Sequence, residues 1–266
     1  MGIGITLGLH LTPEARWAIR SAERVLYLVP DPAAAAWIEG LNPAASSLEG
    51  RYAPGRPRQQ TYRDIVEEVL GYVRKGLRVC LVLYGHPGVF AAPSHRAVRG
   101  ARAEGFPATM LPGVSAEDCL FADLGVDPGE AGCQSYGATD YLLFPRRFDP
   151  TAALVLWQVG AIGPPVGTGT PNREGLRALA ERLADAYGPD HPVVLYEASP
   201  YPTSGPVVHH TPLRDLPRAP LSGMATLYVP PAGVPAPDRE MFARLGISPE
   251  EWPDRAPATL AGRGTA

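Results

Sequence analysis

Apolar residues recur along this chain in runs of strand length, separated by segments with helical spacing. Several runs are continuous rather than alternating, which is typical of strands buried on both faces of a sheet. The runs predicted as strands are Ile3–Leu9, Val25–Val29, Val79–Tyr84, Ala108–Leu111, Tyr141–Phe144, Leu154–Val159, Val193–Tyr196 and Met224–Val229. Strands that alternate with helices predict an α/β protein with a largely parallel or mixed sheet.

Capping residues predict where the helices begin. Thr12 stands before a proline, and Thr61 opens "TYRDIVEEVLGYVRKG", which has the most regular apolar stripe of the chain. Ser115 and Asn172 are expected to cap two further helices. Asp238 is expected to cap a short helix over 239–245.

Breaks in the proline and glycine pattern predict the domain organisation. A break near residues 112–114 separates two predicted α/β lobes, 1–113 and 114–231. Residues 232–266 begin as a proline-rich linker and continue as a short helical tail, in which Ser248 also has the features of a helix start. In α/β folds of this kind, ligands bind at the carboxyl ends of strands.

Composition excludes several functional classes. Hydrophobic residues make up 45% of the chain and charged residues 19%, which suits a folded soluble protein. A formal net charge of −3 gives no electrostatic case for binding nucleic acid or an acidic membrane. No apolar run approaches the roughly 18 residues of a membrane span, and the first residues lack the basic start of a signal peptide. We expect a cytoplasmic protein with neither nucleic acid nor membrane as a partner.

Three short patterns are weak candidates for a site. The glycines of "GIGITLG" do not match the G-x-G-x-x-G spacing of a dinucleotide site. Neighbouring residues of a strand point to opposite faces, so His209 and His210 are not expected to chelate a metal together. The three cysteines are widely spaced and form no metal-type pair. No metal is therefore expected.

The stretch "YGHPGVF", residues 84–90, follows a buried apolar run and cannot continue a strand. A tight turn before a helix near Ser94 explains it as well as a ligand site does. A second strand end of the same kind, Leu111–Val114, runs into the helix that Ser115 caps. Two such ends with exposed backbone amides can cradle a polar small molecule, which favours a ligand site.

A third group consists of Tyr52, Arg58 and Tyr62, in "RYAPGRPRQQTYRDI". Its composition is that of a solvated basic loop with a tyrosine packed on the core. The functional alternative is that an arginine beside a phenol stabilises the phenolate and so lowers the pKa of the phenol. Such a phenolate would be a base strong enough for a poor acid.

Taken together, "YGHPGVF", "PSHRAV", "PGVSAEDCLFADLG", "WQVG", "LYEAS" and "ATLYVPP" resemble a known family. It is the peptide backbone α-N-methyltransferases of borosin (omphalotin-type) biosynthesis, in the tetrapyrrole methylase superfamily. The similarity runs from about residue 2 to residue 231. It implies two α/β lobes with S-adenosylmethionine (SAM) in the cleft between them. Most superfamily members carry Gly-Asp-Pro where this chain has Gly85-His86-Pro87.

The resemblance also implies roles for particular residues. The implied SAM contacts are Tyr84, His86, Val89, Ser115, Ala116, Gln158, Ser199, Ala225 and Thr226. The implied catalytic group is Tyr52, Arg58 and Tyr62, with Tyr62 as the base and Tyr52 or Arg58 as the donor to an imidate oxygen. Glu49 stands where some members carry a further tyrosine. S-adenosylhomocysteine would be the product, no metal would be needed, and a homodimer is implied.

In fused members of this family, the methylated peptide is the carboxyl terminus of the enzyme itself. Residues 232–266 lack the run of Val, Ile and Leu expected of such a peptide. We therefore expect a split system that acts in trans on a separate precursor peptide, as a homodimer with two peptides and with the tail as a docking or dimer element. The alternatives are a methylase acting on a tetrapyrrole or other small molecule, and a SAM-binding regulatory module without turnover.

Overall fold

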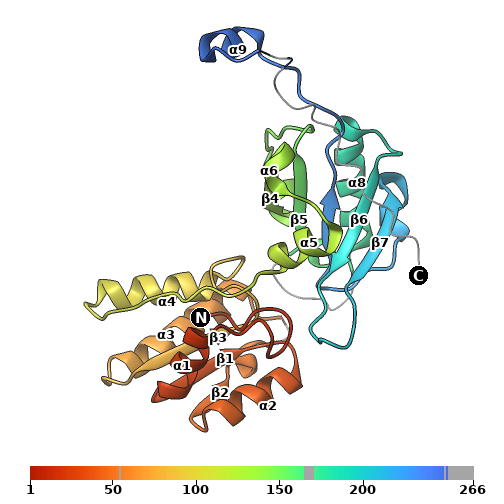
Figure 1. The fold of residues 1–266 in the computed structure, drawn as a ribbon. Helices are drawn as coiled ribbons and strands as arrows, with labels where there is room; N and C mark the ends of the chain where they lie inside the picture. Colours follow the sequence, from red (N-terminus) through yellow and green to blue (C-terminus); the bar gives the residue numbers. More distant parts are fainter. Residues whose placement is uncertain (54, 165–170, 249, 251–266) are drawn as a thin grey trace. The chain divides into compact units, whose positions relative to one another are not determined.

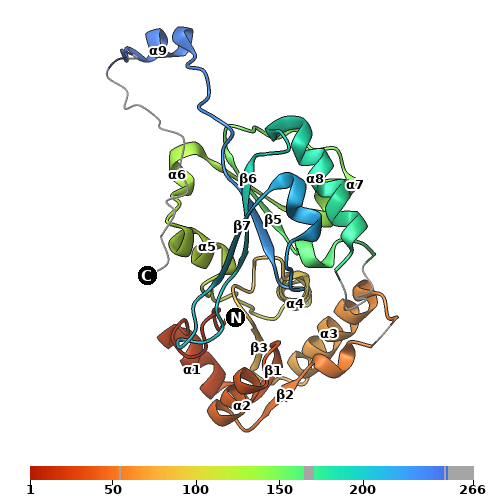
Figure 2. The ribbon, with the colours of Figure 1, turned by 90° about the vertical axis from the view of Figure 1, so that its right-hand side faces the viewer.

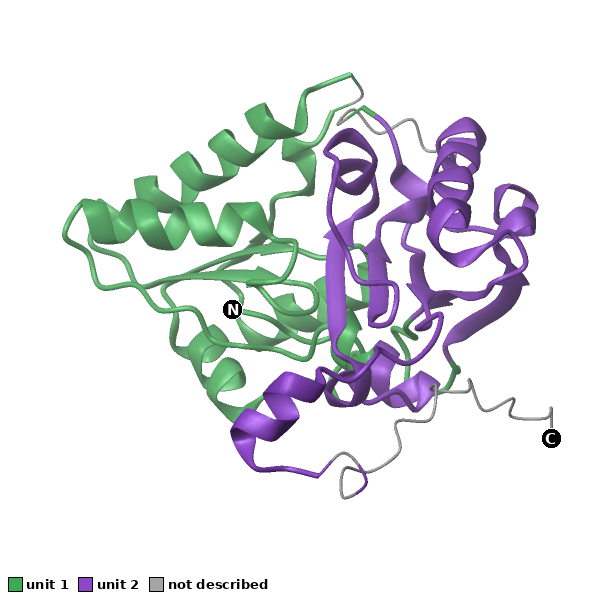
Figure 3. Cartoon of the chain, turned by 90° about the horizontal axis from the view of Figure 1, so that it is seen from above, with its two compact units in different colours: residues 1–119, 164–168, 198–205 green, residues 120–163, 169–197, 206–266 purple. Residues whose placement is uncertain are grey.

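The computed structural model describes residues 1–53, 55–164, 171–248 and 250. The chain forms two compact units (Figure 3). Unit 1 consists mainly of Met1–Cys119 together with Ala198–Gly205, and unit 2 contains most of the described residues that follow Cys119. Each unit has its own β-sheet covered by helices, which confirms the predicted α/β class.

Unit 1 contains a parallel sheet with strand order β2-β1-β3. The strands are β1 (Arg24–Leu28), β2 (Ala45–Ser47) and β3 (Val79–Leu83). The amino-terminal segment continues the sheet beyond β3 only through isolated bridges at Gly2 and Gly4.

The predicted strand over Ile3–Leu9 is therefore wrong. Gly4 and Gly8 have φ values of +73° and +76°, so they turn the backbone out of the extended conformation. The predicted strand at Ala108–Leu111 is also wrong, because this segment has no strand pairing and runs as irregular chain.

Two pairs of helices cover the sheet of unit 1: α1 (Pro13–Ser21) with α2 (Pro32–Leu41), and α3 (Arg58–Val73) with α4 (Ala92–Ala103). Successive residues of β1 point to opposite faces of the sheet, so each face packs against one pair of helices. Val25 packs in the cluster that contains residues of α1 and α2, whereas Leu26 packs in the cluster that contains Ile65 of α3 and Ala97 of α4. Figure 1 shows α3 and α4 side by side.

Helix α3 begins at Arg58, three residues before the predicted cap. Thr61 is buried inside the helix, and its hydroxyl donates to the carbonyl oxygen of Arg51 at 3.4 Å. Residues four apart on a helix lie on one face, so the earlier start places Arg58 directly below Tyr62.

Unit 2 contains a mixed sheet with strand order β4-β5-β8-β6-β7, in which only the β4–β5 pair is parallel. The strands are β4 (Cys133–Gly137), β5 (Ala153–Trp157), β6 (Pro192–Glu197), β7 (Val207–Pro212) and β8 (Thr226–Val229). The predicted strand over Tyr141–Phe144 is wrong. Those residues lie mostly in helix α7 (Ala138–Leu143), whose buried Tyr141 packs in the same core as β5.

The other helices of the chain are α5 (Ala116–Leu124), α6 (Pro128–Ala131), α8 (Arg173–Tyr187) and α9 (Arg239–Leu245), with 3-10 turns η1 (Glu49–Arg51), η2 (Val159–Ala161) and η3 (Leu213–Arg218). Figure 2 shows α7 beside α8 on one face of the second sheet. Three further predicted caps are confirmed: the side chains of Thr12, Asn172 and Asp238 accept hydrogen bonds from Ala15 N, Gly175 N and Met241 N. Most of the helix start predicted at Ser248 lies outside the described residues.

Candidate functional site

Four glycines of unit 1 bring three chain segments into backbone contact at the end of β3. The amide of Gly85 donates to the carbonyl of Gly4 at 2.9 Å. A Cβ on Gly113 would lie 2.7 Å from the carbonyl oxygen of Gly85, and a Cβ on Gly2 would lie 2.1 Å from the same atom. Only residues without a side chain allow this approach, so the predicted pairing of "YGHPGVF" with "LPGV" is confirmed as a spatial contact.

Hydrogen bonds from its own residues and from α4 fix the loop after Gly85. His86 Nδ1 accepts from the amide of Gly88 at 2.9 Å. Ser94 donates to the carbonyl of Pro87, and His95 Nε2 lies 2.9 Å from the carbonyl oxygen of Gly88, to which it must donate. The loop is therefore held from both sides and is a preformed turn.

Ser115 closes the amino terminus of α5. Its side chain is 5% exposed, its hydroxyl and its amide both donate to Asp118 Oδ2 at 2.7 Å, and its Oγ accepts from the amide of Asp118 at 3.1 Å. Both predicted contacts at this place, Ser115 and Ala116, thus lie in one tightly capped helix turn directly after Gly113.

Of the remaining residues predicted to contact the cofactor, some lie in unit 1 and the others in unit 2. Tyr84 and Val89 belong to the loop after β3, and Ser199 belongs to the segment 198–205 of unit 1, where its carbonyl accepts from Thr6 Oγ1 at 3.2 Å. In unit 2, Gln158 directly follows β5 and Thr226 begins β8.

Gln158 has a backbone conformation that residues other than glycine rarely adopt. Its φ is +58°, and its side chain is exposed. The next amide, that of Val159, donates to the carbonyl of Ala225 at 3.1 Å, so the end of β5 and the start of β8 meet. A strained, exposed glutamine at a strand end is typical of a ligand contact rather than of a core position.

Tyr52, Arg58 and Tyr62 are brought together within unit 1. Burial raises the pKa of Tyr52 to about 12, the nearby phenol of Tyr62 contributes in the same direction, and Arg58 opposes both. Arg58 lowers the pKa of Tyr52, as the sequence predicted for an arginine beside a phenol. Desolvation outweighs this effect, so the net shift of the Tyr52 pKa is upward. Tyr52 is thus a proton donor at neutral pH.

Nearby arginines of the same loop are neutralised by carboxylates. Arg51 donates to Glu68 at 2.9 Å, and Arg56 forms an ion pair with Asp64. Among the described residues, no carboxylate pairs with Arg58. Its positive charge therefore remains available beside the two phenols.

Sequence reasoning missed the contribution of α4. Its first turn holds Ser94 and His95, which bind the cofactor loop, and Arg96, whose guanidinium lies 5.9 Å from the centre of the Tyr62 ring. The pattern that could have revealed them is "SHR", three polar residues in succession at the start of a helix otherwise rich in alanine.

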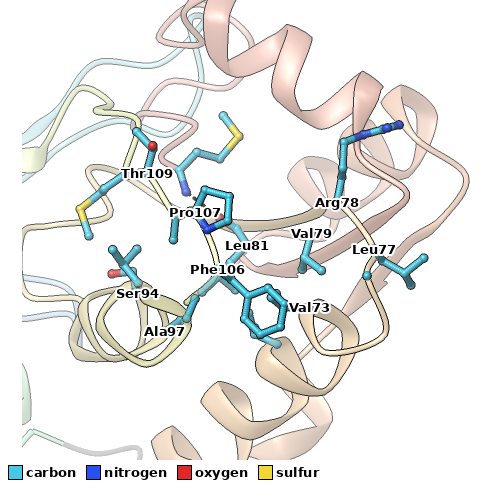
Figure 4. A pocket seen from close by; sticks show the side chains of 17 residues that line it. Val73, Leu77, Arg78, Val79, Leu81, Ser94, Ala97, Phe106, Pro107 and Thr109 are labelled. Atoms are coloured by element: carbon cyan, nitrogen blue, oxygen red, sulfur yellow. Dashed lines mark hydrogen bonds between the residues drawn. The ribbon is translucent and has the colours of Figure 1, made fainter. Parts of the chain in front are cut away.

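A cavity of about 450 Å³ lies elsewhere in unit 1, between β3, α3, α4 and residues 106–110. Figure 4 shows its mostly apolar lining, with Val73, Leu81 and Phe106 among the side chains. None of the predicted site residues lines it, so we assign it no part in the site.

No helix among the described residues is long and apolar enough to cross a membrane. The same residues contain no group of three or more His, Cys, Asp or Glu side chains arranged to hold a metal ion.

An α/β fold with glycine-lined loops at its strand ends is typical of proteins that bind a small molecule there. The model of the tetrapyrrole (corrin/porphyrin) methylases matches residues 1–217, so the chain belongs to that family. It resembles the uroporphyrin-III C-methyltransferase of Thermus thermophilus, with a TM-score of 0.63 and 23% identity over 87% of this chain and 92% of that one. It also resembles the structure of the uroporphyrin-III C-methyltransferase of that organism in complex with S-adenosylhomocysteine. The TM-score is 0.58, and the identity is 19% over 86% of this chain and 94% of that one. These likenesses show the fold.

Relatives with higher identity confirm the resemblance to borosin enzymes. The methyltransferase/gymnopeptides precursor of Gymnopus fusipes is 41% identical over 96% of this chain and 62% of its own length. The methyltransferase/omphalotin A precursor of Omphalotus olearius is 41% identical over 96% of this chain and 63% of its own length. A type I borosin methyltransferase/precursor of Serendipita vermifera is 38% identical over 98% and 66%. The chain thus spans a little under two thirds of the length of these relatives.

Proposed function

We propose that this chain is a SAM-dependent methyltransferase that N-methylates backbone amides of a peptide, and that the peptide is a separate precursor supplied in trans. The observation that carries the proposal is the Tyr52–Arg58–Tyr62 group, two phenols around a cation without a carboxylate partner among the described residues. The names of the borosin relatives support the class of substrate.

A peptide amide is a poor nucleophile until its nitrogen loses a proton and negative charge moves to the oxygen. Tyr62, as phenolate, takes that proton. Tyr52 keeps its own proton because its pKa is raised to about 12, and it donates to the imidate oxygen together with Arg58. Loss of one such donor costs about 3 kcal/mol of transition-state stabilisation.

The residues present fit SAM in their chemistry. In unit 1, the backbone groups of residues 84–89 and the Tyr84 phenol are donors and acceptors of the kind that an amino acid and a ribose require, and in unit 2 the exposed Gln158 amide is another. When bound, SAM supplies an electrophilic methyl group and leaves as S-adenosylhomocysteine. The role of the chain is to position the amide nitrogen for that transfer.

The composition of residues 232–266 supports action in trans, because they contain eleven Ala and Gly and no run of Val, Ile and Leu that resembles a methylated core peptide. A homodimer with two peptides is proposed from the family resemblance, with the proline-rich tail as a docking or dimer element.

The test is mass spectrometry of the protein and of the short peptide encoded by the neighbouring reading frame, expressed alone and together. We expect steps of +14 Da at backbone amides of the peptide, and none on the protein. Tyr62→Phe and Arg58→Ala should bind SAM with unchanged affinity and lose methylation. If the Tyr62→Phe protein turned over at the wild-type rate, Tyr62 would not be the base.

The alternatives predict different products. Steps of +14 Da on the chain's own residues 232–266 would overturn action in trans. Methylation of uroporphyrinogen III without methylation of any peptide would favour the tetrapyrrole reaction. Calorimetric binding of SAM without any product would favour a regulatory module.

A further inference from the structure

The first turn of α4 contacts both halves of the candidate site in unit 1. Ser94 and His95 bind the carbonyl groups of Pro87 and Gly88 in the cofactor loop. The next residue, Arg96, extends toward α3 and places its guanidinium 5.9 Å from the centre of the Tyr62 ring. One rigid helix turn thus connects the loop proposed for the methyl donor with the proposed base.

Arg96 is held in place from α3. Its Nη2 donates to Gln59 Oε1 at 2.6 Å. Gln59 and Tyr62 are three residues apart on α3, so they lie on the same side of that helix. The hydrogen bond lies at the protein surface and holds the guanidinium on the side of α3 that carries Tyr62.

The charges around Tyr62 are unbalanced. Among the described residues, neither Arg58 nor Arg96 pairs with a carboxylate, whereas the neighbouring Arg51 and Arg56 both do. Negative charge that develops on the Tyr62 oxygen would therefore meet positive charge that no carboxylate among the described residues already compensates.

We propose that Arg96 is a positioning residue for Tyr62: its guanidinium orients the ring and stabilises the negative charge that the oxygen acquires when it loses its proton. Arg58 acts from one turn below on α3, and Arg96 acts from α4. A cation within about 6 Å of an aromatic ring is attracted to the ring. The inference rests on the proposed function, because it assigns a further residue to the same reaction.

The test compares Arg96→Gln, Arg96→Lys and, as a matched control, Arg99→Gln, which changes an exposed arginine one turn further along α4. Full-length proteins are assayed with the neighbouring-frame peptide and SAM. We expect Arg96→Gln to lower kcat about tenfold, with KM for the peptide and Kd for SAM unchanged. Arg96→Lys should recover most of the rate because it keeps the charge, and Arg99→Gln should behave as wild type.

Several outcomes would overturn the assignment. Full kcat in Arg96→Gln would do so, as would an equal loss in Arg96→Lys and Arg96→Gln. A rise in Kd for SAM that accounts for the lower rate would show that Arg96 only supports the fold of the loop. An inactive wild-type protein would instead refute the proposed function, so the two failures are distinguishable.

A second variant covers the case in which Arg96→Gln does not fold. Gln59→Ala leaves both charges in place and removes only the hydrogen bond that orients Arg96. Its kcat should lie between those of the wild type and Arg96→Gln, with unchanged Kd for SAM. A Gln59→Ala protein with wild-type kcat would contradict the orienting role.

Discussion

His86 performs with a ring nitrogen what an aspartate carboxylate does in many turns. Its Nδ1 accepts the amide of Gly88, two residues further along the chain, at 2.9 Å. Aspartate makes the same bond in an Asx-turn. The resemblance places Gly-Asp-Pro in most superfamily members, and the geometry explains how histidine can replace aspartate without loss of the turn. The ring nitrogen Nε2 then carries the proton and can act as a donor.

Gly113 is a residue at which a single methyl group should disturb the backbone contact of the three segments. In Gly113→Ala, the new Cβ would meet the carbonyl of Gly85 at 2.7 Å and Gly2 Cα at 3.0 Å, both of them backbone atoms that cannot turn aside. We expect a loss of about 1–3 kcal/mol in the free energy of unfolding and weaker SAM binding. Urea denaturation and calorimetry measure the two effects.

Gly40→Ala is the control for this prediction, because a Cβ there meets nothing within 4 Å. It should bind SAM as the wild type does. If Gly113→Ala also bound SAM with wild-type affinity, the close approach of the three segments would not be needed for the cofactor.

At the residue scale, short motifs predicted more than composition did. The predicted pairing of the 84–90 stretch with "LPGV" and the proximity of Tyr52, Arg58 and Tyr62 are both present in unit 1. Arg96 was not foreseen, because its role depends on how α4 packs against α3. Arg96 and Tyr62 are 34 positions apart in the sequence, so no local pattern predicts their contact.

At the scale of elements, strands buried on both faces were predictable and edge or short strands were not. β1, β3, β5, β6 and β8 coincide with continuous apolar runs. The strands β2 and β7 have the sequences "ASS" and "VVHHTP", which carry too little apolar character to stand out. The run in α7 was taken for a strand because four apolar residues have no period that separates a strand from a helix.

A single substitution in helix α3 is expected to stabilise the protein. Gly71 lies in the helix interior, and a Cβ there would meet nothing within 4 Å. Gly71→Ala should therefore raise the free energy of unfolding by about 0.5–1 kcal/mol, because alanine loses less backbone entropy in a helix. Urea denaturation at equilibrium measures the change. Unchanged or lower stability would mean that the last turns of α3 need the flexibility of glycine.

At the scale of the whole molecule, buried tyrosines set the stability at alkaline pH. Burial raises the pKa of Tyr27 in unit 1 and of Tyr228 in unit 2 from 10.0 to about 12, and Glu39 adds to the shift of Tyr27. Between these values the folded protein binds more protons than the unfolded chain. Its stability is therefore complete below about pH 10 and falls as the pH rises toward about 12.

We expect a loss of about 1 kcal/mol per tyrosine by about pH 11. Urea denaturation across this range, with phenolate absorbance recorded in parallel, measures it. Tyr27→Phe should lose stability less steeply with pH, because it has one fewer phenol to ionise. A stability that is constant from neutral pH to beyond about pH 11 would contradict the assignment.

The first turn of α4 limits how this chain can change in length. Ser94, His95 and Arg96 reach three different partners, and successive residues of a helix are rotated by about 100° from each other. One residue inserted or deleted between Gly88 and Ala92 would change the spacing between the helix turn and the carbonyl groups of Pro87 and Gly88, so Ser94 and His95 would lose their partners together. The structure can tolerate point substitutions in this connection, because they leave the spacing unchanged. Insertions and deletions change the spacing and are not tolerated. Variation in length among natural or engineered forms should therefore be absent from this short segment and be found in other loops.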